Sequence, residues 1–137
     1  MTQTAQAPLK VLVYSDDAHT RDQVMLALGE RPHPDLPRLD FVEVATEPMV
    51  FAHLDTGTFS LAILDGEAVP AGGMGVARQV KDEIYQAPPV LVLTGRRDDA
   101  WLATWSRADA AVPHPLDPMQ LADVVVRLLR GRLATAG

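Results

Sequence analysis

The sequence contains no cysteine, which excludes disulfides, thiolate-bound metals and thiol nucleophiles. Aromatic residues make up only 5% of the 137 residues, and no unbroken apolar run approaches the roughly 20 residues needed to cross a bilayer. Basic residues are also in deficit, with 12 Lys and Arg against 18 Asp and Glu and a formal net charge of −6. A nucleic-acid interface needs a concentrated basic face, so we expect no nucleic-acid partner.

The start of the chain, residues 1–8, has neither the basic beginning nor the apolar core of a signal peptide. Together with the lack of cysteine, this makes a cytoplasmic location the default expectation, with no direct insertion into a membrane. The chain is 47% hydrophobic and long enough for one domain that buries roughly two-thirds of its unfolded surface. We expect this single domain at 9–132, with disordered ends at 1–8 and 133–137.

Short apolar runs alternate with helical patterns along the whole chain. Predicted strands cover 9–14, 39–45, 59–65, 90–93 and 110–112, and predicted helices follow them near 19–28, 46–57, 76–84, 98–107 and 117–132. Five such units in alternation predict an α/β fold with a doubly wound parallel sheet and helices on both faces. The connection at 30–38 contains three prolines, which predict an irregular segment.

The third predicted strand, Phe59 to Asp65, is a nearly unbroken apolar run that ends in a carboxylate, and Gly66 follows it. Such a run is typical of a strand covered on both faces of a parallel sheet. Ligands of these sheets bind at the carboxyl edge of the strands, so Asp65 is a candidate reactive or binding residue. Short acids after strands also cap the loop that follows, and the spacing alone leaves both interpretations open.

Polar residues also end the first, fourth and fifth predicted strands, namely Ser15-Asp16-Asp17, Thr94 and His114. Because parallel strands end at the same edge of a sheet, these side chains should converge with Asp65. With strand tips in this order, the chain resembles the receiver domain of response regulators over about 9–132. That domain is the CheY-like form of the flavodoxin-like fold, so the resemblance implies a five-stranded sheet in the order 2-1-3-4-5.

The resemblance assigns roles to the residues at this edge. It implies that Asp65 stands where the family has the aspartate that accepts a phosphoryl group from a histidine kinase. Thr94 stands at the hydroxyl residue that contacts the phosphoryl group. The run from Ser15 to Arg21 aligns with the family's Asp-Asp-Glu-Pro-x-x-Arg, which keeps Arg21 and puts Asp16 at the main metal-binding acid.

Several positions depart from the family pattern. Ser15 replaces the other metal-binding acid, so the implied Mg²⁺ site, Asp16 with Asp65, is expected to be weak and not required. His114 replaces the family's lysine, although Pro115 is kept, and an imidazole is mostly uncharged near neutral pH. The family's switch aromatic is replaced by Ala111, and in the loop after the third strand the proline, Pro70, falls one residue late.

These losses favour a pseudo-receiver that works without the usual phosphorylation and acts through protein–protein interaction. The alternative is a phosphorylatable single-domain response regulator of a two-component system, with Asp65 as the phosphoacceptor. We expect no enzymatic activity, because no serine lies in a nucleophile elbow and the four histidines show no paired metal spacing. A flavin- or nucleotide-binding protein of the same fold is disfavoured, since Asp16 and Asp17 would repel a phosphate at the first loop.

The sequence ends about five residues after the last predicted helix, so we expect any output to lie on another protein. The fourth helix carries Trp101 and Trp105, which are candidate partner-binding anchors, although aromatics at this spacing also pack in cores. The chain is most similar to stand-alone actinobacterial receivers, a group associated with the respiratory NADH-quinone oxidoreductase. This resemblance implies an accessory or regulatory subunit of that membrane-bound complex, held peripherally at the inner face of the cell membrane.

Overall fold

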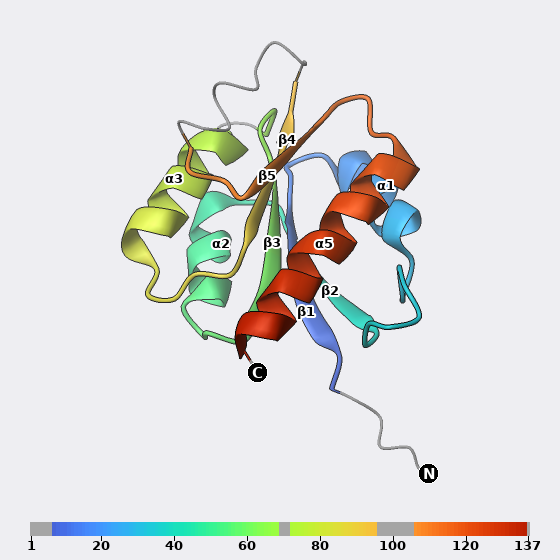
Figure 1. Ribbon diagram of the computed structural model, residues 1–137. Helices are drawn as coiled ribbons and strands as arrows, with labels where there is room; N and C mark the ends of the chain where they lie inside the picture. Colours follow the sequence, from blue (N-terminus) through green and yellow to red (C-terminus); the bar gives the residue numbers. More distant parts are fainter. Residues whose placement is uncertain (1–6, 69–71, 96–105, 137) are drawn as a thin grey trace.

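The computed structural model describes residues 7–68, 72–95 and 106–136. Within these ranges one five-stranded sheet is formed by β1 (Leu9–Tyr14), β2 (Leu39–Val44), β3 (Phe59–Asp65), β4 (Val90–Thr94) and β5 (Ala110–Pro113). The strands lie in the order β2-β1-β3-β4-β5, and each neighbouring pair is parallel (Figure 1). The predicted doubly wound sheet and the strand order implied by the resemblance are both confirmed.

Helices cover both faces of this sheet. The described residues contain α1 (Ala18–Leu28), α2 (Glu47–Leu54), α3 (Gly73–Glu83) and α5 (Pro118–Ala136). Figure 1 shows α1 and α5 on one face of the sheet and α2 and α3 on the other. The predicted fourth helix and its two tryptophans, Trp101 and Trp105, lie at positions outside the described residues, apart from 106–107.

One predicted boundary is wrong. The helix α5 runs to Ala136, so residues 133–136 are helical and do not form the disordered tail expected at 133–137. The apolar stripe stops before these residues, but Leu133 and Ala134 have high intrinsic helix propensity. Gly131 does not end the helix either, because a glycine inside a helix costs only about 1 kcal/mol relative to alanine. Helix propensity therefore carries α5 beyond the last buried side chain, Leu129.

The apolar interior is divided into two clusters by the sheet. Val11 and Val13 of β1 point to the side of α1 and α5, whereas Leu12 and Tyr14 point to the side of α2 and α3. This alternation follows from the pleat of a strand, and all of β4 is buried because both of its faces are covered. A fully buried aliphatic side chain contributes about 1.5–3 kcal/mol, so β1, β3 and β4 form a rigid support for the residues at their tips.

The connection between α1 and β2 is irregular, as its three prolines predict. It is held against α5, because Arg130 Nη2 lies 3.1 Å from His33 Nε2 and 3.2 Å from Asp35 Oδ2. Leu36 is buried and belongs to the cluster beneath α1 and α5. The connection is therefore held by polar contacts with Arg130 and by the burial of Leu36.

The two edge strands are short and differ in character. On β2, Asp40 and Glu43 are exposed, while Leu39 and Val44 are buried. At the other edge, β5 has four residues and ends in Pro113. No helix within the described ranges combines the length and the apolar character that a membrane span requires.

Candidate functional site

The predicted site residues meet at the carboxyl edge of the sheet. Ser15 directly follows β1, Asp65 ends β3, Thr94 ends β4 and His114 directly follows β5. The strand register sets Asp65 beside Leu93 and Thr94 beside Pro113. The convergence predicted from the strand tips is thus observed, and Asp65 and Thr94 end strands that are buried along nearly their whole length.

The carboxylate of Asp65 is held on both of its oxygens. Asp65 is 3% exposed, and its Oδ2 accepts a hydrogen bond of 2.8 Å from the Ser15 hydroxyl. Its Oδ1 accepts from the Glu67 backbone N–H at 2.9 Å and lies 3.2 Å from His114 Nε2. The loop-capping interpretation of Asp65 is therefore confirmed, and it coexists with a position at the ligand-binding edge.

Ser15 also fixes the turn between β1 and α1. It is fully buried, and its Oγ accepts a 3.0 Å hydrogen bond from the Asp17 backbone N–H while donating to Asp65. Its carbonyl accepts a 2.5 Å hydrogen bond from Arg21, whose Nε lies 3.1 Å from Glu43. Ser15 is therefore more than the replacement of a metal-binding acid, because it is a direct hydrogen-bond partner of Asp65.

The surroundings of Asp65 carry further negative charge. Asp16 is exposed next to the buried Ser15, and Asp17 caps α1 by accepting a 2.9 Å hydrogen bond from the His19 backbone N–H. The carboxylate of Glu67 lies directly over Gly95, so closely that a methyl group on Gly95 would collide with it. Two further carboxylates, those of Asp16 and Glu67, therefore lie in the loops that follow β1 and β3.

This donor set does not fit a firm Mg²⁺ site. Mg²⁺ prefers several oxygen ligands in near-octahedral geometry. No cluster of three or more acidic or imidazole side chains suited to a metal is found among the described residues. The two candidate carboxylates are Asp16 and Asp65, and the oxygens of Asp65 are already engaged by Ser15, Glu67 and His114. The weak site on Asp16 and Asp65 stays a prediction.

Tyr14 is a buried titratable group that sequence reasoning did not single out. It is 1% exposed and directly precedes Ser15 on β1. Burial raises the pKa of its phenol, and the nearby carboxylates of Glu47, Asp16 and Asp65 raise that pKa further. The available signal was a tyrosine that follows three apolar strand residues and is separated by a single serine from a pair of acids.

The positions implied for signal readout are only partly described. Thr94 is 2% exposed at the end of β4, and the His114 backbone N–H donates to its carbonyl at 2.7 Å. Ala111, at the place of the switch aromatic, packs against the cluster on the side of α2 and α3. Pro70 and the two tryptophans, Trp101 and Trp105, lie outside the described residues.

Comparison with known proteins identifies the family. No family model matches the chain. Two curated proteins from two strains of Mycobacterium tuberculosis, each named an uncharacterized response regulatory protein, are 64% identical over 122 residues, which covers 89% of this chain and 92% of each relative. The chain belongs to the response-regulator family.

Solved receiver structures share the fold of this response regulator. A CheY-like receiver domain from Methanospirillum hungatei matches with a TM-score of 0.74 at 18% identity, over 94% of this chain and 99% of that one. The chemotaxis response regulator CheY4 of Vibrio cholerae matches with a TM-score of 0.73 at 19% identity, over 89% and 99%. At these identities the likeness shows the fold alone.

Receiver domains commonly bind Mg²⁺ at their phosphorylation site and interact with other proteins. In this receiver, the family resemblance assigns that site to Asp65, where Ser15 takes the place of an acid and His114 the place of a lysine. Both replacements contact Asp65 directly. The departures from the family pattern therefore form one hydrogen-bonded group.

Proposed function

We propose that this receiver acts by binding another protein and that phosphorylation of Asp65 does not control the binding. The observation that supports the proposal is the hydrogen bonding of the buried Asp65 carboxylate to Ser15, Glu67 and His114. A nucleophile must present a free oxygen to the group it attacks. Here three contacts occupy most of the roughly four acceptor sites of the Asp65 carboxylate, which leaves little of it open to an incoming group.

Electrostatics adds a second argument for the proposal. Phosphoryl transfer depends on cations that neutralise charge on the transferred group. Around Asp65 the described residues offer the carboxylates of Asp16 and Glu67, whereas the guanidinium of Arg21 is engaged by Ser15 and Glu43. A phosphoryl donor would therefore approach against like charge.

The chain also lacks the side chain that would report a change at Asp65. A switch needs an element that moves when the modified residue changes its charge. The family resemblance assigns that role to an aromatic side chain, and this chain has Ala111, whose methyl group is too small to exchange between a buried and an exposed position. A receiver that lacks this element is suited to constant binding of a partner.

The proposal includes a specific partner class. The similarity to stand-alone actinobacterial receivers supports an accessory or regulatory, non-enzymatic subunit of the respiratory NADH-quinone oxidoreductase. This would place the protein in the cytoplasm, at the inner face of the cell membrane through its partner. The curated relatives come from Mycobacterium tuberculosis, and their names mention response regulation and no respiratory enzyme.

A second candidate function is a phosphorylatable response regulator of a two-component system. It is favoured by the retention of Asp65, Thr94 and Arg21, and by the 3.2 Å approach of His114 Nε2 to Asp65 Oδ1. In this reading the imidazole takes over the contact that the resemblance assigns to a lysine. The names of the curated relatives agree with this candidate.

The two candidates differ in what acetyl phosphate does to the protein. After incubation with acetyl phosphate and Mg²⁺, we expect intact-mass measurement to show no phosphoryl adduct. In affinity capture from native membranes, we expect the Asp65→Asn variant to recover as much of the partner as wild type does. Asp22→Asn, an exposed acid on α1, is the control for the loss of one charge. A stoichiometric, hydroxylamine-labile adduct that Asp65→Asn abolishes, with a parallel change in partner recovery, would refute the proposal.

A further inference from the structure

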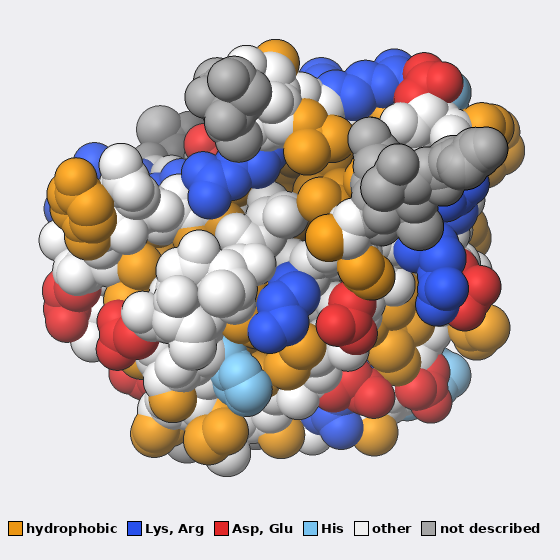
Figure 2. Space-filling model, turned by 90° about the horizontal axis from the view of Figure 1, so that it is seen from below, with side chains coloured by type: hydrophobic (Ala, Val, Ile, Leu, Met, Phe, Trp, Pro, Cys, Tyr) orange, Lys and Arg blue, Asp and Glu red, His pale blue; other side chains and the backbone are white. Residues whose placement is uncertain are grey.

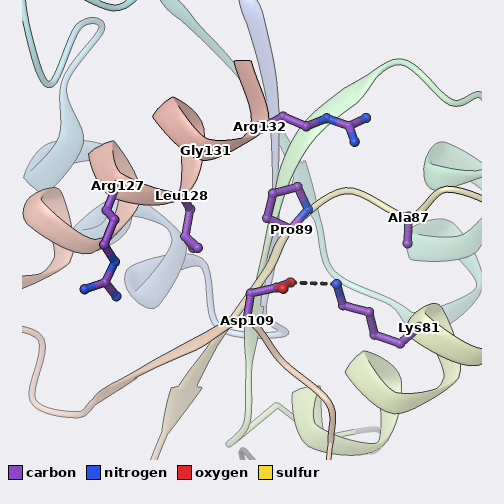
Figure 3. Close-up of a pocket in the computed structure, with 8 residues that line it drawn as sticks. All are labelled: Lys81, Ala87, Pro89, Asp109, Arg127, Leu128, Gly131 and Arg132. Atoms are coloured by element: carbon purple, nitrogen blue, oxygen red, sulfur yellow. Dashed lines mark hydrogen bonds and ion pairs between the residues drawn. The ribbon is translucent and has the colours of Figure 1, made fainter. Parts of the chain in front are cut away.

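A hollow of about 320 Å³ lies at the edge of the sheet opposite to Asp65. Its walls come from the amino ends of β4 and β5, from the end of α3 and from the last turns of α5, as Figure 3 shows. We call it the amino-edge hollow and define it by the residues used below: Lys81, Pro89, Asp109, Arg127, Leu128 and Arg132. With about 3.3 Å per strand residue, the seven residues of β3 separate the two edges by roughly 20 Å.

The amino-edge hollow is basic although the chain is acidic. Three of the four charged residues that line it are Lys or Arg, in a chain whose formal net charge is −6. The single acid, Asp109, is engaged by Lys81, whose Nζ lies 2.6 Å from Asp109 Oδ2. The same oxygen accepts a 2.7 Å hydrogen bond from the Val90 backbone N–H. The charges of Lys81 and Asp109 offset each other, and the other two charged residues that line the hollow are Arg127 and Arg132.

The arrangement of these side chains suits an extended ligand. In Figure 3, Arg127 and Arg132 extend in different directions from α5, and Leu128 and Pro89 lie between them. An apolar floor is thus flanked by two guanidinium groups. A single small anion could not contact both of them at once, whereas a peptide segment could.

The surface continues beyond the hollow on both sides. Arg127 also lines a second hollow, with His33 and Arg130, and Arg132 lines a third, with Tyr85. Tyr85 is 87% exposed, which is unusual for a large aromatic residue. Figure 2 views the molecule from this side and shows basic and acidic side chains set among apolar ones. The three hollows form a band that passes around the end of α5.

We infer that this band binds an acidic linear segment of a partner protein. The carboxylates of the segment would pair with Arg127 and Arg132, and one apolar side chain between them would pack on Leu128 and Pro89. The inference rests on the proposed function in one respect, which is that the partner is another protein. Beyond that function, it specifies which surface binds the partner and which residue types the bound segment contains.

A nucleic acid fits this band less well than an acidic peptide. Each of the three hollows contains one aspartate, namely Asp109, Asp123 and Asp55. A continuous phosphate backbone would meet these carboxylates as well as the net charge of the chain. A peptide can leave apolar or neutral residues at such points, and it can use the exposed ring of Tyr85.

Binding at this band would leave the carboxyl edge free. None of the residues of the amino-edge hollow contacts Ser15, Asp65 or His114 in the described structure. A partner held here would therefore not need any change at Asp65. This geometry accounts for a receiver that binds its partner constantly, and it allows the two surfaces to be tested separately.

The test uses the full chain and a fluorescein-labelled peptide in which one leucine lies between two pairs of glutamates. We expect saturable binding by fluorescence anisotropy at low salt, and a loss of affinity of about tenfold in the double variant Arg127→Glu/Arg132→Glu. The double variant Arg38→Glu/Arg78→Glu makes the same change of charge outside the hollows and should bind normally. Circular dichroism melting checks that each variant is folded.

Nuclear magnetic resonance of the labelled chain locates the site. Peptide addition should shift the backbone amides of Asp109, Leu128 and Gly131 and leave that of Gly66 unchanged. Absence of peptide binding, equal binding of a peptide with lysines for glutamates, equal losses in both double variants, or tighter binding of a single-stranded oligonucleotide would each overturn the inference. These results would leave the acetyl phosphate test of the proposed function intact.

Discussion

Replacing Ser15 by aspartate would put a second carboxylate against Asp65 in a fully buried position. In the native chain the Ser15 hydroxyl donates to Asp65 Oδ2 at 2.8 Å, so the new oxygens would lie within about 4 Å of those of Asp65. Two like charges at that distance repel by about 4 kcal/mol at an effective dielectric constant near 20. Side-chain rearrangement relieves part of this repulsion, and we expect the charge to lower the free energy of unfolding by about 3 kcal/mol.

The matched control is Ser15→Asn, which has nearly the same size and no charge. Its cost of about 1–3 kcal/mol measures the overpacking at a site that has no exposed surface. The difference between the aspartate and asparagine variants therefore isolates the repulsion with Asp65. Urea unfolding followed by circular dichroism, with EDTA in the buffer, provides both free energies.

The same unfolding measurements in the presence of Mg²⁺ test whether the added carboxylate forms a metal site. A ligand that binds only the folded state stabilises it by about 2.7 kcal/mol when present at a hundredfold excess over its dissociation constant. The aspartate variant would add a third carboxylate to the candidate Mg²⁺ pair Asp16 and Asp65, so we expect saturating Mg²⁺ to restore most of its lost stability and to change wild type and Ser15→Asn little. The reasoning fails if both variants are equally stable in EDTA, or if Mg²⁺ stabilises all three proteins alike.

Two further predictions concern stability. Because the pKa of Tyr14 is raised in the folded state, the unfolded chain loses the phenol proton first as the pH rises. The contribution of Tyr14 to the free energy of unfolding is therefore fully present below about pH 10 and is lost as the pH rises through the folded-state pKa. Urea unfolding at increasing pH should show a smaller loss of stability for Tyr14→Phe than for wild type or for Tyr85→Phe, which changes an exposed tyrosine. Gly66→Ala should lower the free energy of unfolding by about 2 kcal/mol, because the added methyl carbon would lie 2.6 Å from the Leu93 carbonyl oxygen. Gly75→Ala, where α3 has open space, should raise it by about 0.5–1 kcal/mol, and the opposite ranking in chemical denaturation would contradict the steric argument.

The sequence predicted the strands better than it predicted the contacts at their tips. The bounds of β3 agree with the prediction because a nearly unbroken apolar run ends abruptly at Asp65. The convergence of the strand tips followed from parallel geometry alone. The strand order came from the resemblance to receivers, because apolar patterns do not specify which strands are neighbours.

The hydrogen bonds around Asp65 could not be predicted in this way. Ser15 and Asp65 lie 50 positions apart, and a serine at the end of a strand gives no local signal of its distant partner. The same is true of the Arg130 contact with His33, which anchors a proline-rich connection across 97 positions. Local patterns determine which residues are buried, whereas these pairs depend on the angle at which each turn leaves its strand.

The edges of the sheet limit how this protein can associate with copies of itself. An open strand edge is a template to which another chain can add by backbone hydrogen bonding. On β2 the exposed carboxylate of Asp40 makes that edge unfavourable for a second strand, and Glu43 reinforces it while paired with Arg21. On β5 the short strand ends in Pro113, which has no N–H to offer. Both edges therefore carry features that disfavour growth of the sheet from chain to chain by strand addition.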